Sequence, residues 1–225
     1  MSSDQASEQS SAIESGAGPS AKPRKFFEFG PDIRGGGKGH GVCIANEDAL
    51  RTPGLITFAP PPKKGYGFAD LPEKPQLIHD PKKGKLPRDL QYLVGYLLVS
   101  ERLKLLFEAV DAAAFEFVDC DFTLADGTRG PHYYLADVVR VLDAVDEDAS
   151  PDLRIEYDRD FRTGQDIKIY NLVGGASLVF RQDMVGKAHV FRTPYIGKIF
   201  CDEVLKSACK AAGITGTYFK DATRM

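Results

Sequence analysis

The chain has 225 residues, a formal net charge of −3 and 43% hydrophobic residues. This apolar content can fill a sizeable core, which excludes a protein that is disordered throughout. The small negative charge argues against a general nucleic-acid binder, so we expect no nucleic-acid partner. No apolar run approaches the roughly 18 residues of a membrane span, and the first residues lack the apolar stretch of a secretory signal. We therefore expect a cytoplasmic protein.

The four cysteines fit that expectation. Cys43, Cys120, Cys201 and Cys209 form no CxxC pair and no regular framework. A chain of this length does not need disulfides for stability. We expect reduced cysteines that are buried in the core.

The N-terminal part of the chain has an irregular composition. Residues 1–25 are rich in Ser, Ala, Gly and Gln without an apolar period, which predicts a disordered leader. Residues 26–94 follow as a region rich in Pro, Gly and Lys. Within it, 26–30 (FFEFG) and 41–47 (GVCIANE) are strand candidates, whereas 52–90 favours loops and edge pieces.

Residues 95–225 are more regular and are expected to form an α+β domain. Ser100 stands where it can cap a helix. The apolar residues that follow have the spacing i, i+3, i+4 and i+7 of one helix face; they are Leu103, Leu106, Phe107 and Val110. Residues 115–135 then alternate around Asp126-Gly127, a signal for a two-residue hairpin turn.

The remaining chain is rich in short strand candidates, at residues 152–157, 166–173, 177–181, 188–192 and 197–201. Asp202 can cap a last helix that places Val204, Leu205 and Ala208 toward the core, and Gly213 ends it. Residues 216–220 close the chain as a strand.

The order of these elements predicts the fold class. Strands follow one another instead of alternating with helices, which favours an α+β fold with a mainly antiparallel sheet and a few packing helices. Residues 138–146 (VVRVLDAVD) fit both a strand and a helix face, so their structure stays open.

The glycine-rich stretch GGGKGHG at 35–41 resembles a phosphate-binding loop only superficially. A P-loop requires GxxxxGK[ST], but Gly36 stands where Lys is needed and Gly39 follows Lys38. The dinucleotide motif GxGxxG would need a buried strand before it and a helix directly after it. We interpret the stretch as a flexible turn.

No motif indicates a metal or catalytic site. The four histidines form no HExxH or other zinc pattern, and no GxSxG elbow is present. Asp119 and Asp121 share one face of an alternating stretch and could form an acid/base pair, although a solvated sheet face is the simpler interpretation. We expect no cofactor, no metal and no catalytic residue.

Charge is distributed unevenly along the chain. Residues 105–160 carry 15 acidic and 4 basic side chains, whereas the flanking segments 61–104 and 161–225 are net positive. A solvated face is one interpretation of this acidic block. The other is a surface that attracts a basic partner.

Motifs in the C-terminal half resemble a known family. They comprise HYYLADVVRVLDAVDEDAS (132–150), SLVFR (177–181) and HVFRTPYIGKIFCDEVLKSACKAAGITGTYF (189–219). Their order is similar to that of a bacterial family first known only as a domain of unknown function. That family was later assigned to the immunity proteins of polymorphic toxin systems, as the eleventh class. The resemblance covers roughly residues 95–222.

The resemblance implies a cytoplasmic protein that binds a cognate toxin and occludes it, without catalysis. If so, the most acidic loop is the first candidate for the contact surface; its members are Asp143, Asp146, Glu147, Asp148 and Asp152. The alternative is a small enzyme or binding protein for a phosphorylated or nucleotide ligand. It would use the glycine-rich stretch with Lys38 and His40, together with the Asp119/Asp121 pair.

Overall fold

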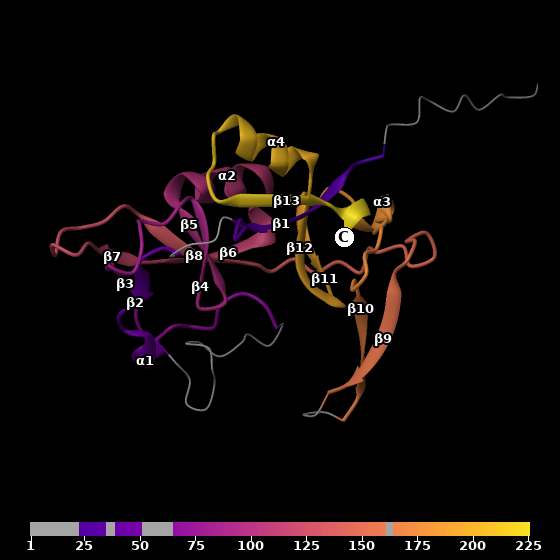
Figure 1. Cartoon of the computed structure of the whole chain (residues 1–225), viewed down its shortest axis with the longest axis horizontal. Helices are drawn as coiled ribbons and strands as arrows, with labels where there is room; N and C mark the ends of the chain where they lie inside the picture. Colours follow the sequence, from indigo (N-terminus) through magenta and orange to yellow (C-terminus); the bar gives the residue numbers. More distant parts are fainter. Residues whose placement is uncertain (1–22, 35–38, 51–64, 161–163) are drawn as a thin grey trace, which may run out of the picture.

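The computed structural model describes residues 23–34, 39–50, 65–160 and 164–225. These residues form mainly antiparallel sheets with a few helices, which confirms the predicted α+β class (Figure 1). Most of the predicted leader, residues 1–22, and residues 35–38 of the glycine-rich stretch lie outside the described residues.

The first sheet brings the two ends of the described chain together. Its strand order is β11-β12-β1-β13, and all neighbours are antiparallel. The strands are β11 (Val190–Thr193), β12 (Ile196–Asp202), β1 (Phe26–Pro31) and β13 (Thr217–Asp221). Phe26 belongs to one apolar cluster and Phe27 to another, so both faces of β1 are covered. This explains the nearly continuous apolar run at 26–30.

The second sheet has the order β4-β5-β8-β6 and is also antiparallel. Its strands are β4 (Leu90–Leu93), β5 (Tyr96–Ser100), β8 (Tyr133–Val138) and β6 (Phe115–Asp119). Val94 and Gly95 connect β4 to β5, with φ angles of 51° and 86°. Positive φ at both central residues is the geometry of a tight two-residue hairpin.

The third sheet joins β2 (Val42–Ile44), β3 (Gln76–His79) and β7 (Asp121–Thr123), with β3 parallel to β7. The alternating stretch 115–135 is therefore divided between two sheets, with the buried Cys120 at the break. Asp126-Gly127 does form a turn, in which Gly127 N donates to the Leu124 carbonyl over 2.9 Å. The loop is longer than the predicted two residues, because Thr123 and Arg129 form the next bridge.

One further strand expectation needs correction, and one open alternative is resolved. Residues 177–181 form no sheet strand; only the isolated bridge between Val145 and Phe180 involves them. Leu178 and Phe180 are buried. The backbone of residues 177–181 forms hydrogen bonds to three separate segments, at residues 144–146, 151 and 222, instead of to one neighbouring strand. Residues 138–146, which fitted both strand and helix, run extended beyond β8 and are fixed by this bridge and a second one to Arg192.

The helices are α1 (Glu47–Leu50), α2 (Glu101–Asp111), α3 (Gln182–Val185) and α4 (Glu203–Ala211), with short 3-10 turns at Ala112–Ala114 and Ala222–Arg224. The predicted caps are confirmed: Leu103 N donates to the Ser100 hydroxyl over 3.4 Å, and Val204 N donates to Asp202 over 3.0 Å. Gly213 ends α4 at φ 59°. The next amide, of Ile214, donates back to the carbonyl of Cys209, as in a Schellman motif.

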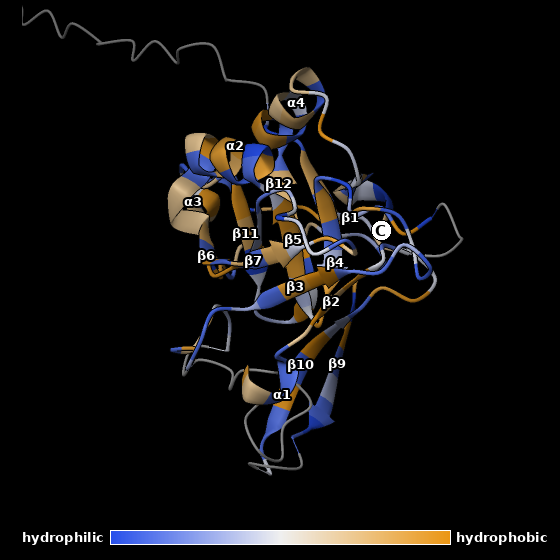
Figure 2. Ribbon diagram, turned by 90° about the vertical axis from the view of Figure 1, so that its left-hand side faces the viewer, coloured by the Kyte–Doolittle hydropathy of each residue, from blue (hydrophilic) through white to orange (hydrophobic). Residues whose placement is uncertain are grey.

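Three apolar clusters fill the interior. The largest lies between the first two sheets and beneath α2 and α4 (Figure 2). Leu205 of α4 is fully buried there, as predicted, but Val204 is 46% exposed, so its predicted core position is wrong. The second cluster lies behind β11, β12 and the chain end, and the third surrounds β2, β3 and β7.

Residues from both sides of position 95 share these clusters. The division of the chain into 26–94 and 95–225 stays a prediction about independent folding.

Asp89 connects three parts of the main core. Its carboxylate accepts hydrogen bonds from the Ser100 hydroxyl, the Arg102 guanidinium and the Thr215 amide and hydroxyl, over 2.5–2.8 Å. Burial alone would raise the pKa of Asp89, but these bonds hold it well below its usual range. The buried carboxylate therefore ties β4 to the start of α2 and to the loop after α4.

The cysteines are free, as expected, but not all belong to the core. Cys120, Cys201 and Cys209 are buried, and burial raises the pKa of Cys120 and of Cys209 to about 12. Cys43 is exposed, which corrects the expectation for that residue. Strand β2 alternates inward and outward, and Cys43 takes the outward position.

A two-stranded arm stands apart from these sheets. It consists of β9 (Arg154–Arg159) and β10 (Asp166–Asn171), and it extends away from the body (Figure 1). β9 begins two residues later than the predicted strand 152–157. All six of its side chains are exposed.

Candidate functional site

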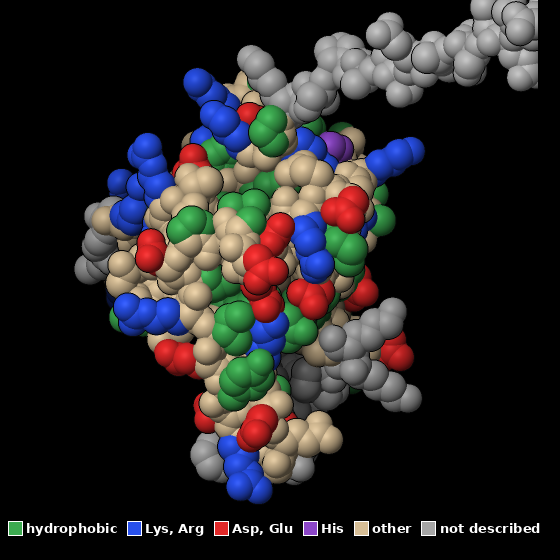
Figure 3. All heavy atoms as spheres, turned by 90° about the vertical axis from the view of Figure 1, so that its right-hand side faces the viewer, with side chains coloured by type: hydrophobic (Ala, Val, Ile, Leu, Met, Phe, Trp, Pro, Cys, Tyr) green, Lys and Arg blue, Asp and Glu red, His purple; other side chains and the backbone are tan. Residues whose placement is uncertain are grey.

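The acidic loop lies between β8 and the arm. Acidic side chains gather on the face of the molecule that carries the arm (Figure 3). Ala144 and Val145 are buried in the second cluster, and Asp146 N donates to the Val179 carbonyl over 2.8 Å. This anchoring fixes the loop where its charged side chains surround the base of the arm.

Three of the five predicted contact residues are engaged within the protein. Asp143 lies 3.3 Å from the Tyr195 hydroxyl, and Asp146 accepts a hydrogen bond from the Ala149 amide over 3.1 Å. Glu147 accepts hydrogen bonds from the Lys168 ammonium and the Tyr170 hydroxyl of β10. The hydrogen bond from Lys168 lowers the pKa of Glu147. These carboxylates shape the loop and join it to the arm.

Asp148 and Asp152 have a different environment. Both are exposed, and neither forms an ion pair within the part of the chain that the structure describes. Asp152 has a positive φ of 63°, a conformation that Asp and Asn tolerate better than most residues. Of the five predicted residues, only Glu147 is paired with a cation among the described residues, and Asp148 and Asp152 are exposed.

Five other acidic residues of the block 105–160 are paired with basic residues. The ion pairs are Arg140–Asp111, Arg192–Asp137, Lys104–Glu108 and Lys74 with both Asp119 and Asp121. Lys74, Lys104, Lys168 and Arg192 come from outside the block, so counting them reduces its excess of negative charges from 11 to 7.

The Asp119/Asp121 pair is bridged by a lysine. Lys74 Nζ lies 2.7 Å from Asp119 and 2.9 Å from Asp121, and His132 Nε2 lies 2.5 Å from Asp119. Burial would raise the pKa of Asp119, but the hydrogen bonds from Lys74 and His132 outweigh it and lower the pKa. The hydrogen bond to Asp119 raises the pKa of Lys74 to about 12. A carboxylate whose pKa is lowered, as that of Asp119 is, does not suit a general acid.

Residues 39–41, the part of the glycine-rich stretch that the structure describes, also have a structural role. His40 Nε2 lies 2.8 Å from the Tyr92 carbonyl, and Val42 N donates to Nδ1 over 3.3 Å. Nδ1 therefore accepts and Nε2 donates, which occupies both ring nitrogens. Gly41 packs against the backbone of Asp80 and Gly84. A Cβ added at Gly41 would lie 2.2 Å from the Asp80 carbonyl oxygen and 2.8 Å from that of Gly84, so only glycine fits there. Lys38 lies outside the described residues.

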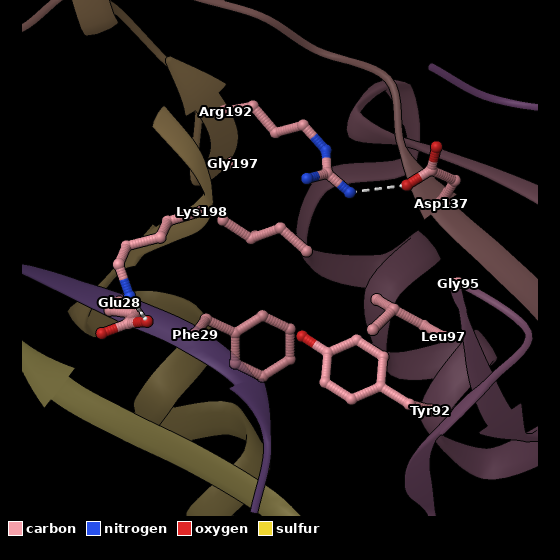
Figure 4. A pocket seen from close by; sticks show the side chains of 10 residues that line it. Glu28, Phe29, Tyr92, Gly95, Leu97, Asp137, Arg192, Gly197 and Lys198 are labelled. Atoms are coloured by element: carbon pink, nitrogen blue, oxygen red, sulfur yellow. Dashed lines mark hydrogen bonds and ion pairs between the residues drawn. The ribbon is translucent and has the colours of Figure 1, made fainter. Parts of the chain in front are cut away.

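A polar pocket of about 270 Å³ lies between the first two sheets (Figure 4). Arg192 donates to Asp137 over 2.7 Å on one side of it, and Lys198 pairs with Glu28 on the other. Tyr92 points its hydroxyl toward the ring of Phe29. Sequence reasoning did not identify this pocket, although each of the four charged residues interrupts an apolar strand pattern, as Glu28 does in FFEF. The charges compensate one another, which suits a polar seam between two sheets.

Within the described ranges, no cluster of three or more His, Cys, Asp or Glu side chains could hold a metal ion. Among the same residues, no helix is both long and apolar enough to cross a membrane.

Comparison with known proteins identifies the family. The model of the Immunity protein family (Imm11) matches residues 25–224. The chain belongs to the Imm11 family. The match begins well before residue 95, where the resemblance in the sequence began, and it includes β1 and the third sheet. None of the curated proteins compared with this Imm11 chain matches it significantly.

Proposed function

We propose that this Imm11 protein acts in the cytoplasm, where it binds a cognate toxin and neutralises it by covering the toxin's working surface, without catalysis. The family match over residues 25–224 carries the proposal. An occluding protein needs a complementary surface and a few anchors instead of reactive groups. Lys74 pairs with Asp119 and Asp121, and Arg192 pairs with Asp137. Carboxylates that are held in ion pairs within the fold support a role that needs no reactive group.

We infer that the acidic loop contributes to the contact surface. Asp148 and Asp152 supply exposed negative charge, whereas Asp143, Asp146 and Glu147 hold the loop in place. Such a surface favours a toxin with a basic patch. Complementary charge mainly accelerates association, and salt weakens the effect.

The test uses the cognate toxin, and a toxin gene beside this gene would be the first candidate. Co-expression with the chain should restore the growth of cells that the toxin otherwise kills, and the two proteins should purify together. Growth arrest that persists despite abundant folded chain would overturn the proposal.

The loop is tested by replacing Asp148 and Asp152 with Asn, which removes both charges and suits the positive φ of Asp152. At about 0.05 M salt we expect slower association with the toxin, and at about 0.5 M salt the rates should converge with wild type. Glu203→Gln in α4, far from the loop, is the matched control and should leave both rates unchanged. Equal rates for the double variant and wild type at low salt would contradict the role of the loop.

A further inference from the structure

The arm is joined to the body at one small site. Within the described residues, every hydrogen bond and aromatic contact that leads from β9 or β10 to the body ends on Glu147 of the acidic loop or on Tyr195, between β11 and β12. On the arm, these contacts come from Lys168 and Tyr170 of β10. We call these four residues the arm joint.

Lys168 lies at the centre of the arm joint. Its ammonium donates a hydrogen bond to Glu147, which also accepts one from the Tyr170 hydroxyl. Lys168 Nζ lies 4.7 Å from the centre of the Tyr195 ring and 5.5 Å from that of the Tyr170 ring. The hydrogen bond to Glu147 raises the pKa of Lys168, so the cation persists at neutral pH. One ammonium therefore contacts all three other members of the joint.

Lys168 is also the contact nearest the tip of the arm. Tyr170 fixes the base of β10, because its side chain is 3% exposed and its N–H donates to the Tyr195 carbonyl over 2.9 Å. Lys168 comes two residues earlier in β10, on the side of the tip. A contact at this position controls the direction in which the arm projects from the body (Figure 1).

We propose that Lys168 is a positioning residue, which holds the arm and the acidic loop as one fixed contact surface for the cognate toxin. Glu147 belongs to the loop and Lys168 to the arm, so their hydrogen bond fixes each element with respect to the other. A surface that is fixed before binding loses less entropy when a partner docks. The inference rests on the proposed function, because that function assigns the acidic loop to the toxin contact.

Charge and position make opposite predictions for the loss of Lys168. Lys168→Met removes one positive charge and leaves Glu147 without its cation, so the surface becomes more acidic. If charge alone mattered, a basic toxin would associate faster and bind more tightly. If Lys168 positions the arm, binding weakens although the attraction grows. We expect the Kd of the Met variant to rise about fivefold or more, mainly through faster dissociation.

Two further variants make this comparison specific. Arg159→Gln is the matched control, because it removes one positive charge from the same arm and lies outside the arm joint. It should leave the Kd unchanged or lower it. Lys168→Arg keeps a cation that can contact both rings and Glu147, so it should restore wild-type affinity. All three variants should keep the circular dichroism spectrum of wild type. A Met variant that binds the toxin as tightly as the Arg159→Gln variant overturns the proposal.

The position of the arm can also be measured without toxin. The chain has no tryptophan, so Ile167→Trp places a single tryptophan fluorophore on the arm. Ile167 is 47% exposed and, as the neighbour of Lys168 in β10, points to the opposite face. Adding Lys168→Met should increase the segmental motion seen in the fluorescence anisotropy decay, whereas adding Arg159→Gln should not.

Equal anisotropy decays with and without Lys168 would overturn the positioning role, whatever the toxin does. A wild-type chain that binds no toxin would instead refute the proposed function, and with it the assignment of this surface to the toxin. The two failures are therefore distinguishable.

Discussion

Leu205→Ala tests how firmly α4 belongs to the main core. Leu205 is 0% exposed and lies in the cluster that also contains Phe107 and Cys209. Truncation to Ala leaves a cavity enclosed by α2, α4 and the first sheet. Buried Leu→Ala changes lower the free energy of unfolding by about 2–5 kcal/mol. We expect the free energy of unfolding to fall by about 3 kcal/mol, because the site is fully buried on all sides. For a chain of this size, the melting temperature should fall by about 6–12 °C.

Val204→Ala is the matched control, since it removes an apolar side chain from the neighbouring position of the same helix. Val204 is 46% exposed, so we expect a change within about 0.5 kcal/mol. Urea unfolding followed by circular dichroism gives both free energies from one experiment. A loss at Leu205 that does not exceed the loss at Val204 would refute the packing of α4.

Four further changes address stability and the alternative function. Asp89→Asn should destabilise the chain by about 2–4 kcal/mol at pH 7. Because folding lowers the pKa of Asp89, its carboxylate contributes to the free energy of unfolding fully above the unfolded pKa, near 4, and loses this contribution as pH falls. The difference in unfolding free energy between variant and wild type should therefore shrink in acid. An equal difference at pH 3 and pH 7 would contradict this. Arg24 donates hydrogen bonds to Asp202 and to two backbone carbonyls. Arg24→Ala should therefore lower the melting temperature, whereas deletion of residues 1–22 should not, and the reverse result would show that these hydrogen bonds do not stabilise the fold. Replacing Lys38 and His40 together with Ala should leave toxin binding unchanged, and its loss in a folded variant would favour the enzyme hypothesis.

Local signals in the sequence predicted much of the fold. Ser100, Asp202 and Gly213 mark helix ends because capping depends on residues within one turn. Val204 was placed in the core wrongly, since a helix as short as α4 leaves the direction of its apolar face uncertain by one position. The pairing of β7 with β3 depends on residues more than 40 positions apart. The alternation of side chains within 115–135 therefore could not predict that β7 pairs with β3.

The site was harder to predict than the fold. A count of charges located the acidic loop, but it could not show that Glu147 is compensated by Lys168, because that pair depends on the fold. The strands of the arm were predicted, but not their projection from the body. Alternation of side chains predicts a strand, but it does not predict whether another element packs against the faces of that strand.

Titration of the toxin's activity with this chain tests the central claim most directly. Purified cognate toxin is held at a concentration far above the dissociation constant and mixed with increasing amounts of chain. Occlusion predicts that activity falls linearly to its floor at one chain per toxin, and that the end point does not change with incubation time. Inactivation by much less than one equivalent of chain, increasing with time, would reveal catalysis and contradict the account.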